Sequence, residues 1–319
     1  MKKVLITILL IGVIIFATIQ WKVYQINSAN EEFTYEKLSQ QPVGKEIYVV
    51  CPDGTRLRTI ASGEGQTVLL AHGFGGTIHN WNLVFEQLVK DGFHVIAFDQ
   101  RGHAKSSVGK DGVNSTSMAG DYKTILDFYN VKNGVLVGHS MGGFLSIKFL
   151  LDYPEVAKQR LKSALILGSF AGDINKDNDQ NKYQIPLIKN GWIDKILANE
   201  SLATLLQASV IAKPYKALVK TALDDFKPQN FVQLTPILQA FVDENYYPRL
   251  KEITIPCTIL VGTADKTTPS FHAENLSKGI ANAVLVKVEG RGHLLNWEAP
   301  KEVCEQIEKL AKETILVKQ

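Results

Sequence analysis

The chain has few cysteines, no concentrated block of charge and no internal repeat. Its 319 residues contain three scattered cysteines, Cys51, Cys257 and Cys304. Their spacing matches neither a metal site nor a disulfide framework, so we expect three small core residues. With 35 Lys and Arg against 32 Asp and Glu, the net charge is +3. No basic stripe or acidic tail is present, which argues against a nucleic-acid partner. The lack of repeats excludes a repeat architecture.

The composition that is present is that of an ordinary globular protein. Apolar residues make up 45% of the chain and charged residues 21%. A chain of this length is long enough for one large α/β domain that carries an insertion.

One long apolar run lies at the N-terminus. Residues 4–19 are apolar apart from two threonines and a glycine, Trp21 closes the run, and Lys22 follows. A membrane-spanning helix needs about 20 residues, and a secretory signal has a shorter apolar part that ends in a small-residue cleavage site. No clear cleavage pattern follows this run. We therefore expect an uncleaved signal anchor, with a cleaved signal peptide as the alternative.

The charges around this run predict its orientation. Lys2, Lys3 and the terminal amine outnumber Lys22, so the N-terminus should stay inside. The rest of the chain would then lie on the extracytoplasmic side, tethered to the membrane. If the signal were cleaved instead, the protein would be secreted.

The body of the chain alternates short apolar strands with segments of helical spacing. Such alternation predicts a mostly parallel sheet covered by helices on both faces. The expected strands are residues 45–51, 56–62, 68–71, 95–98, 135–137, 164–167, 257–261 and 284–288, and the expected helices are 80–90, 117–129, 269–279 and one from Pro300.

The strand pattern stops between residues 171 and 251. Apolar residues there recur at helical spacing, after a polar stretch over residues 173–184 that reads as a loop. About 80 residues are too many for a connector, so we expect a helical lid over the strand ends. The predicted organisation is an anchor and start of tether at 1–28, core at 29–170, lid at 171–250 and core again at 251–319.

The most informative motif is Gly-His-Ser-Met-Gly at residues 138–142. It follows the apolar strand 135–137 and leads into a helix, which is the context of a nucleophile elbow. The sharp turn strains the middle residue and leaves no room for side chains on the flanking glycines. We expect Ser140 to be lifted clear of the sheet at a helix N-terminus, where backbone N–H groups stabilise an oxyanion.

A serine nucleophile needs a base and a group that orients the base. After Ser140 the only histidines are His272 and His293. His293 follows the last strand and is the expected base, whereas His272 reads as a surface residue of a helix. Asp265 follows the strand 257–261 and is the preferred acid, and Asp173 is its competitor after the strand 164–167.

The glycine-rich loop at residues 72–76 follows the strand that ends at Ala71. A loop at this place presents a backbone N–H to the serine, so Phe74 N–H and Met141 N–H are the predicted oxyanion pair. His72 is expected to hydrogen-bond the loop. The turn at residues 99–106 is expected to be held by its charges, without a catalytic role.

These motifs resemble the α/β-hydrolase superfamily from residue 45 to 316, leaving out the lid. The matching segments are residues 72–76, 99–106, 138–143, 262–265, 292–293 and 298–300. Ala104 departs from the glycine that relatives often carry. A serine at the elbow differs from the branches that use aspartate there, the haloalkane dehalogenases and epoxide hydrolases. The turn after His72 lacks the Gly-Pro pair of proline iminopeptidases.

The resemblance implies an esterase or a monoacylglycerol-lipase-like enzyme with a Ser140, Asp265 and His293 triad and no cofactor or metal. The expected substrate is a carboxylic ester, either a small molecule or a lipid with a medium-length acyl group. Carbon–carbon bond hydrolysis and cofactor-free perhydrolysis on the same triad are alternatives. A ligand-binding protein with this fold is a further one.

Overall fold

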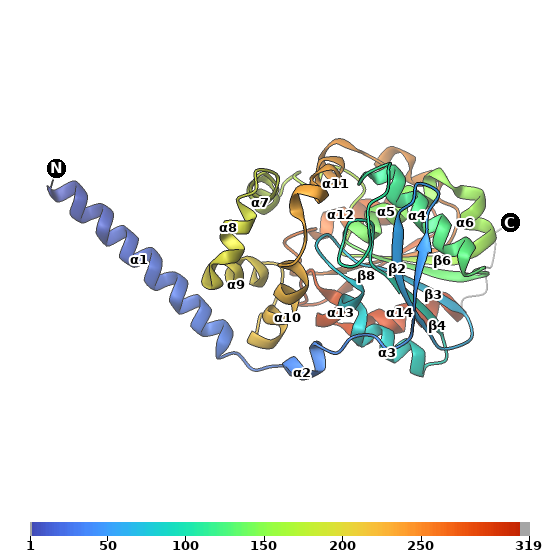
Figure 1. Ribbon diagram of the computed structural model, residues 1–319, viewed down its shortest axis with the longest axis horizontal. Coiled ribbons are helices and arrows are strands. Elements are labelled where there is room, and N and C mark those ends of the chain that lie inside the picture. The colour runs from blue at the N-terminus through green and yellow to red at the C-terminus, as the bar shows by residue number, and fades with distance from the viewer. Residues whose placement is uncertain (1, 313–319) are drawn as a thin grey trace.

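The computed structural model describes residues 2–312 and consists of an α/β body from which one long helix projects (Figure 1). Met1 and residues 313–319, which the predicted anchor and second core segment include, lie outside the described residues. Helix α1 (Lys2–Asn27) is followed by the short α2 (Tyr35–Leu38) and then by the sheet.

Eight strands form one sheet in the order β1-β2-β4-β3-β5-β6-β7-β8. The first two strands pair antiparallel, β2 pairs antiparallel with β4, and all other pairs are parallel. The strands are β1 (Lys45–Val50), β2 (Arg56–Ser62), β3 (Thr67–Ala71), β4 (His94–Phe98), β5 (Gly134–His139), β6 (Leu161–Leu167), β7 (Cys257–Gly262) and β8 (Ala283–Val288). The predicted fold class is confirmed.

Helices cover the sheet on both faces because the central strands are apolar on both sides. Every residue of β3 and β5 is buried. One core cluster joins the sheet to α4 (Ser115–Phe128), α5 (Met141–Asp152) and α12 (Ser270–Gly279). The second joins it to α3 (Asn82–Lys90) and α14 (Pro300–Lys312). The shorter elements are η1 (Ile78–Trp81), α6 (Pro154–Arg160), η2 (Tyr247–Glu252) and α13 (Leu295–Glu298).

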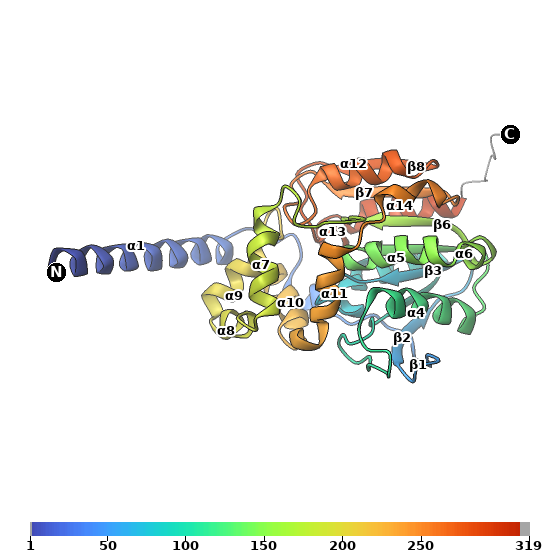
Figure 2. The same cartoon turned by 90° about the horizontal axis from the view of Figure 1, so that it is seen from above.

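Five α-helices, followed by η2, lie between β6 and β7, and these five form a group beside the sheet (Figure 2). We call them the helical insertion: α7 (Asp179–Lys189), α8 (Ile193–Ala198), α9 (Glu200–Ala208), α10 (Lys216–Phe226) and α11 (Phe231–Asp243). Much of the insertion shares a hydrophobic cluster with Leu83, Trp297 and Ile26 of α1. The insertion therefore packs against the body and α1 through this shared cluster, and most of the buried side chains of α11 belong to the core cluster of the sheet.

Two local predictions are wrong. The polar stretch 173–184 is a loop only in its first half, because Asn178 caps α7 by accepting a hydrogen bond from Asn181 N–H, and Ile185 packs into the core. His272 is buried, not at the surface, and its Nδ1 lies 2.7 Å from the hydroxyl of Tyr247. The first prediction was wrong because residues 179–184 are polar in composition and yet helical. The second was wrong because η2 packs against α12 and covers His272.

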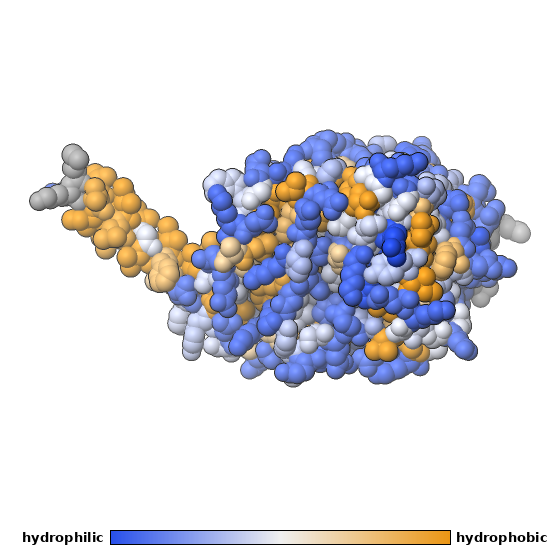
Figure 3. Space-filling model, viewed as in Figure 1, coloured by the Kyte–Doolittle hydropathy of each residue, from blue (hydrophilic) through white to orange (hydrophobic). Residues whose placement is uncertain are grey.

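The three cysteines are free and buried, as the sequence predicts. Helix α1 is long and apolar enough to cross a membrane, and its most apolar part is not buried by the body. Figure 3 shows this helix as an apolar rod outside a mostly polar surface.

Candidate active site

Ser140 lies at the sharp turn between β5 and α5. Its backbone has φ 52° and ψ −115°, a strained conformation for a residue that carries a side chain. A Cβ on Gly138 would lie 2.5 Å from Ser146 Oγ, and one on Gly142 would collide with Ala71 and His72. Both flanking glycines are therefore required by close packing, as the motif predicts.

The loop after β3 packs directly against this turn. A Cβ on Gly73 would lie 3.2 Å from Ser140 Cβ, and Gly75 adopts a positive φ of 68°. Phe74 N–H and Met141 N–H make no backbone hydrogen bond in the described part of the chain. Two unpaired donors thus flank Ser140 at the carboxyl ends of β3 and β5, where the strand order reverses and sheets of this type bind ligands.

Asp265 and His293 meet at the ends of β7 and β8. Asp265 Oδ2 lies 2.8 Å from His293 Nδ1 and accepts the hydroxyl of Thr268 at 2.8 Å. Its Oδ1 accepts the N–H groups of Thr267 and Thr268. Burial alone would raise the pKa of Asp265, but the neighbouring His293 and these hydrogen bonds hold the pKa below its ordinary value. Asp265 is therefore poised to stay ionised.

Ser140 and His293 line the same cavity, whose volume is about 160 Å³. Among the residues that the structure describes, no hydrogen bond joins Ser140 Oγ to the His293 ring. Catalytic hydrogen bonds are often long in structures without a ligand and tighten in the complex. The competing acid, Asp173, is exposed and accepts the N–H of Asn175.

The loop that carries His293 is held by residues that the sequence analysis did not single out for a role. Buried Glu298 accepts the N–H groups of Gly292 and Leu294, one on each side of His293, at 3.0 and 3.1 Å. It also accepts the N–H of Ala212 in the helical insertion at 2.9 Å. The His293 N–H donates to the carbonyl of Val210 in the same segment. The loop is thus fixed jointly by α13 and by the insertion.

His139, the residue before the serine, makes a second contact with the His293 loop that the sequence motifs do not predict. Its Nε2 lies 2.8 Å from the carbonyl oxygen of His293, so Nε2 carries the proton and donates. Burial, and after it the electrostatic influence of the neighbouring His293 ring, lower the pKa of His139 to about 3, so the His139 ring is neutral. The elbow therefore holds the backbone of His293 directly. Only the proximity of strand ends, which sequence does not give, could reveal this contact.

His72 makes hydrogen bonds in its loop, as expected. Its Nδ1 donates to the Gly73 carbonyl at 2.7 Å, and its Nε2 accepts the N–H of Gln100 at 2.9 Å. Burial lowers the pKa of His72 to about 4, although the bond to Gly73 opposes this. The turn at residues 99–106 is also held by charge, through the ion pair of Asp99 with Arg58 at 3.2 Å.

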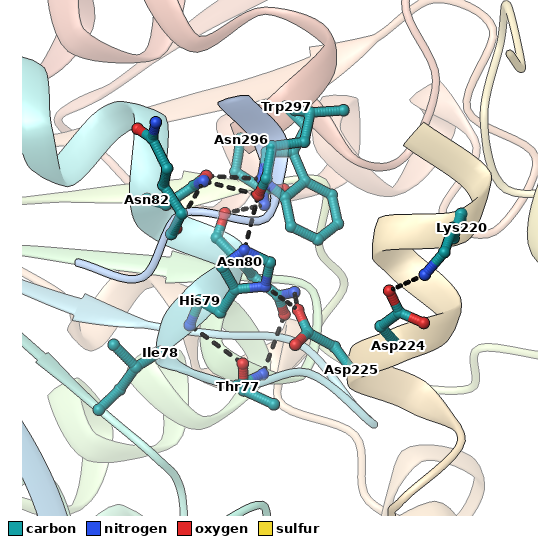
Figure 4. A network of polar contacts seen from close by, with 12 residues as sticks. Thr77, Ile78, His79, Asn80, Asn82, Lys220, Asp224, Asp225, Asn296 and Trp297 are labelled. Carbon is teal, nitrogen blue, oxygen red and sulfur yellow. Dashed lines mark hydrogen bonds and ion pairs between the residues drawn. The ribbon is translucent and has the colours of Figure 1, made fainter. Parts of the chain in front are cut away.

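A polar network joins the insertion to the body at one end of the cavity (Figure 4). Asp225 of α10 accepts hydrogen bonds from His79 and Asn80 of η1, at 2.9 and 2.8 Å. In α13, Asn296 donates to the carbonyl of Asn80, and Trp297 donates to Asn82 at 2.9 Å. Asp225 and Asn80 both line the cavity.

The remaining wall of the cavity is mostly apolar. Its apolar members include Phe74, Ile174, Ile185, Ile188, Val210, Ala222, Phe226, Leu238, Phe241, Leu294 and Trp297. In the described chain, no lysine or arginine lines the cavity. Within residues 2–312, no three His, Cys, Asp or Glu side chains are grouped to hold a metal ion.

Comparison with known proteins identifies the family of this chain. Residues 66–300 match the α/β-hydrolase fold family. The chain belongs to this family, and it is a hydrolase. It is 30% identical to a 2-hydroxy-6-oxononadienedioate/2-hydroxy-6-oxononatrienedioate hydrolase of Paraburkholderia phymatum, over 78% of this chain and 89% of that protein.

Solved structures share the fold. An esterase from Exiguobacterium antarcticum aligns with a TM-score of 0.74 and 23% identity, over 85% of this chain and all of that one. A bromoperoxidase from Bacillus anthracis aligns with the same score and coverage at 21% identity. At these identities the likeness concerns the fold alone.

Proposed function

We propose that the protein is a membrane-tethered serine hydrolase that cleaves carboxylic esters with an apolar acyl group. Ser140 is the nucleophile, His293 the general base and Asp265 the residue that orients it. The observation that carries the proposal is that Ser140 and His293 line one apolar cavity while Asp265 lies 2.8 Å behind the histidine ring.

In this mechanism Ser140 Oγ attacks the ester carbonyl carbon as His293 Nε2 takes its proton. Asp265 holds the proton on Nδ1 and stabilises the imidazolium. The N–H groups of Phe74 and Met141 bind the tetrahedral oxyanion, and one such donor contributes about 2.7–4 kcal/mol to lowering the barrier. His293 then gives its proton to the leaving alcohol and activates water to release the acid from Ser140.

The charge of the cavity favours an ester over the substrate of the curated relative. A nonadienedioate carries two carboxylates, and burying them requires cationic or hydrogen-bonding partners. This cavity offers amide side chains such as Gln184 and Gln207 as hydrogen-bond partners, but it contains Asp225 and no lysine or arginine within the described residues. A neutral ester with an apolar acyl chain, of medium length or from a lipid, fits such a lining better.

Two other uses of the same site are distinguishable by experiment. Perhydrolysis needs only peroxide in place of water, so product analysis separates it from hydrolysis. A ligand-binding role without turnover predicts that a fluorophosphonate probe leaves Ser140 unlabelled. The position of Ser140 at a strained elbow between two unpaired N–H donors favours a reactive serine.

The contacts of α1 favour an anchor that stays attached. Ile26 is buried in the hydrophobic cluster of the insertion, beside Ile193 and Leu197. Cleavage after this helix would expose that cluster to water. We therefore propose that α1 stays attached as the membrane anchor. Because Lys2 and Lys3 precede the apolar run, the hydrolase body would lie on the extracytoplasmic side. The proposal includes no nucleic-acid or metal partner.

The test is hydrolysis of p-nitrophenyl esters of increasing acyl length by the full chain in detergent. We expect turnover to be highest for acyl chains longer than acetyl, to vanish in Ser140→Ala, and to fall by about 10⁴ in Asp265→Asn. Turnover of acetyl esters far above medium-chain esters would reject the apolar acyl group. Folded protein without turnover of any ester would reject the esterase.

A further inference from the structure

The end of α1 is built into the helical insertion. Ile19 and Val23 are half-buried and Ile26 is buried, which is one face of the helix at i, i+4 and i+7. On the same side, Gln20 Nε2 donates to Ser201 Oγ of α9 at 3.2 Å. The last two turns of α1 therefore belong to the insertion, and the helix before them stands free.

This contact gives the depth of the insertion relative to a membrane. The apolar run of residues 4–19 is about 24 Å long at 1.5 Å per residue, slightly less than a hydrocarbon core of about 30 Å. All of it is needed to cross. Trp21 and Tyr24, stacked at 5.7 Å, follow at the place where aromatic side chains mark the interface. Gln20 then lies at the membrane surface, and its partner Ser201 lies there too.

The helices α8 and α9, which pack against each other, expose side chains with the chemistry of an interfacial segment. Trp192 is 53% exposed and Leu202, next to Ser201, is 38% exposed. Lys195 Nζ lies 4.0 Å from the centre of the Trp192 ring. An aromatic ring with an adjacent cation and an apolar side chain suit the headgroup region, where amphipathic side chains gather.

The segment after α1 makes contacts that fix the orientation of the insertion relative to α1. Phe33 N–H donates to the Tyr215 hydroxyl, and Glu31 accepts the N–H of Ala217, both at the start of α10. Arg291, two residues before His293, pairs with Glu32 at 2.8 Å. The tether thus runs along the insertion and holds its orientation to α1.

From this arrangement we propose that the interfacial face, formed by Trp192, Lys195 and Leu202, rests in the headgroup layer of the membrane that α1 crosses. The partner is the bilayer itself, since the chain's own spanning helix sets its distance. The proposal rests on the proposed function for its consequence, which is that an ester dissolved in the membrane reaches the cavity from this side of the insertion. Two helices of the insertion, α7 and α9, line that cavity through Ile188 and Gln207.

The experiment uses the full chain reconstituted in vesicles of phosphatidylcholine and phosphatidylglycerol. Leu202→Cys is labelled with an environment-sensitive nitrobenzoxadiazole dye, and Val284→Cys of β8, 57% exposed on a strand far from α1, is the matched control (Figure 2). The native cysteines are buried, and unsubstituted protein measures their background labelling. We expect a blue shift and quenching by headgroup nitroxide lipids at position 202 and neither at 284.

Activity provides the second arm. Leu202→Glu should lower turnover of an ester carried in the vesicle by roughly tenfold, the effect of removing one Leu-sized contact with the interface. Turnover of a short soluble ester should stay unchanged, and Val284→Glu should change neither. Equal dye signals at 202 and 284, or protein that does not float with the vesicles, would overturn the proposal. If the unsubstituted protein turned over no ester, the proposed function would be rejected. The dye measurement would still show whether the interfacial face contacts the membrane.

Discussion

His79 Nδ1 lies 2.9 Å from Asp225 Oδ2, and this pair joins the body to the helical insertion. The other ring nitrogen, Nε2, lies 2.6 Å from the carbonyl oxygen of Leu38, which only accepts. Asp225 Oδ2 also accepts from Asn80. Both nitrogens of His79 face acceptors, an arrangement that the doubly protonated imidazolium satisfies best. His79 of η1 thus joins Leu38 of α2 to Asp225 of the insertion, and Figure 4 shows its contact with Asp225.

This pair predicts that stability falls with rising pH. Burial would lower the pKa of His79, but Asp225 and the Leu38 carbonyl outweigh burial and raise it above the ordinary value near 6.5. Because the folded pKa is the higher one, the stabilisation is complete below about pH 6.5 and is lost as pH rises through the folded value. Thermal unfolding of the full chain in detergent, measured from pH 6 to 9, should show Tm decreasing.

Asp225→Asn isolates this contribution. It keeps the shape but removes the charge, so the variant should lose about 1.5–3 kcal/mol at pH 6. It should also show a smaller difference in Tm between pH 6 and 9 than the parent. Asp224→Asn is the matched control, since Asp224 pairs with exposed Lys220. Parallel pH curves for parent and Asp225→Asn would contradict the assignment of charge to His79.

Glu298→Gln tests how the base is positioned. The carboxylate accepts three N–H groups, and an amide must turn its NH₂ towards at least one of them. The His293 loop should shift, and misplacement of this kind costs up to about 10²-fold in kcat with little change in KM. The rate of fluorophosphonate labelling should fall in parallel. Glu305→Gln, exposed on α14, should leave both rates unchanged.

Much of the fold was predictable because it rests on local patterns. All eight strands follow from short apolar runs, and the elbow follows from a steric rule that Gly138 and Gly142 obey in the structure. The chain order of serine, acid and histidine, together with the spacing of each candidate from its strand end, selected Asp265 over Asp173 and His293 over His272. Asp265 and His293 lie in hydrogen-bond contact. Which residues stand at the ends of strands follows from local patterns along the chain, so the sequence predicts it. Which strand ends lie next to each other is a separate matter that these patterns do not give.

What sequence could not give depends on distant segments meeting in space. The hydrogen bond of Glu298 to Ala212 joins residues 86 apart, and that of Gln20 to Ser201 joins residues 181 apart. No periodicity encodes such pairs. The start of α7 was missed because a single cap, Asn178, outweighed a polar composition. His272 was misplaced because the packing of η2 against its helix is a tertiary contact.

The hydroxyl of Thr268 offers a test of how Asp265 is kept ionised. It donates to Asp265 Oδ2 at 2.8 Å, beside the histidine proton. Thr268→Val should raise the pKa of Asp265 and weaken its hold on His293, lowering kcat by about tenfold or more, the effect of one hydrogen bond to a charged group. Steady-state kinetics on the best p-nitrophenyl ester measure this.

Thr267→Val is its neighbouring control. The Thr267 hydroxyl has no hydrogen-bond partner among the described residues, and its N–H to Asp265 survives the substitution. Because Thr267 lines the cavity, the variant should alter KM and leave kcat near the parent value. Equal losses of kcat in the two variants would mean that the Thr268 hydroxyl has no special part in holding Asp265.

Gly73→Ala tests the glycine-rich loop at residues 72–76, which carries Phe74 N–H, without replacing a residue of the proposed triad. A Cβ there would lie 3.1 Å from His139 Nδ1 and 3.2 Å from Ser140 Cβ, closer than ordinary contact, so the loop must move away from the elbow. Phe74 N–H would move with it, and losing one oxyanion donor lowers kcat by about 10²–10³. The expected signature is a fall in kcat larger than any change in Tm.

Gly120→Ala in α4 is the matched control for this variant, because its new Cβ would meet only the Tyr153 hydroxyl at 3.3 Å. It should keep full activity, since alanine favours a helix more than glycine does. If Gly73→Ala kept the parent kcat while remaining folded, the second donor could not be Phe74 N–H. Met141 N–H at the start of α5 would then be the one remaining donor of the predicted pair.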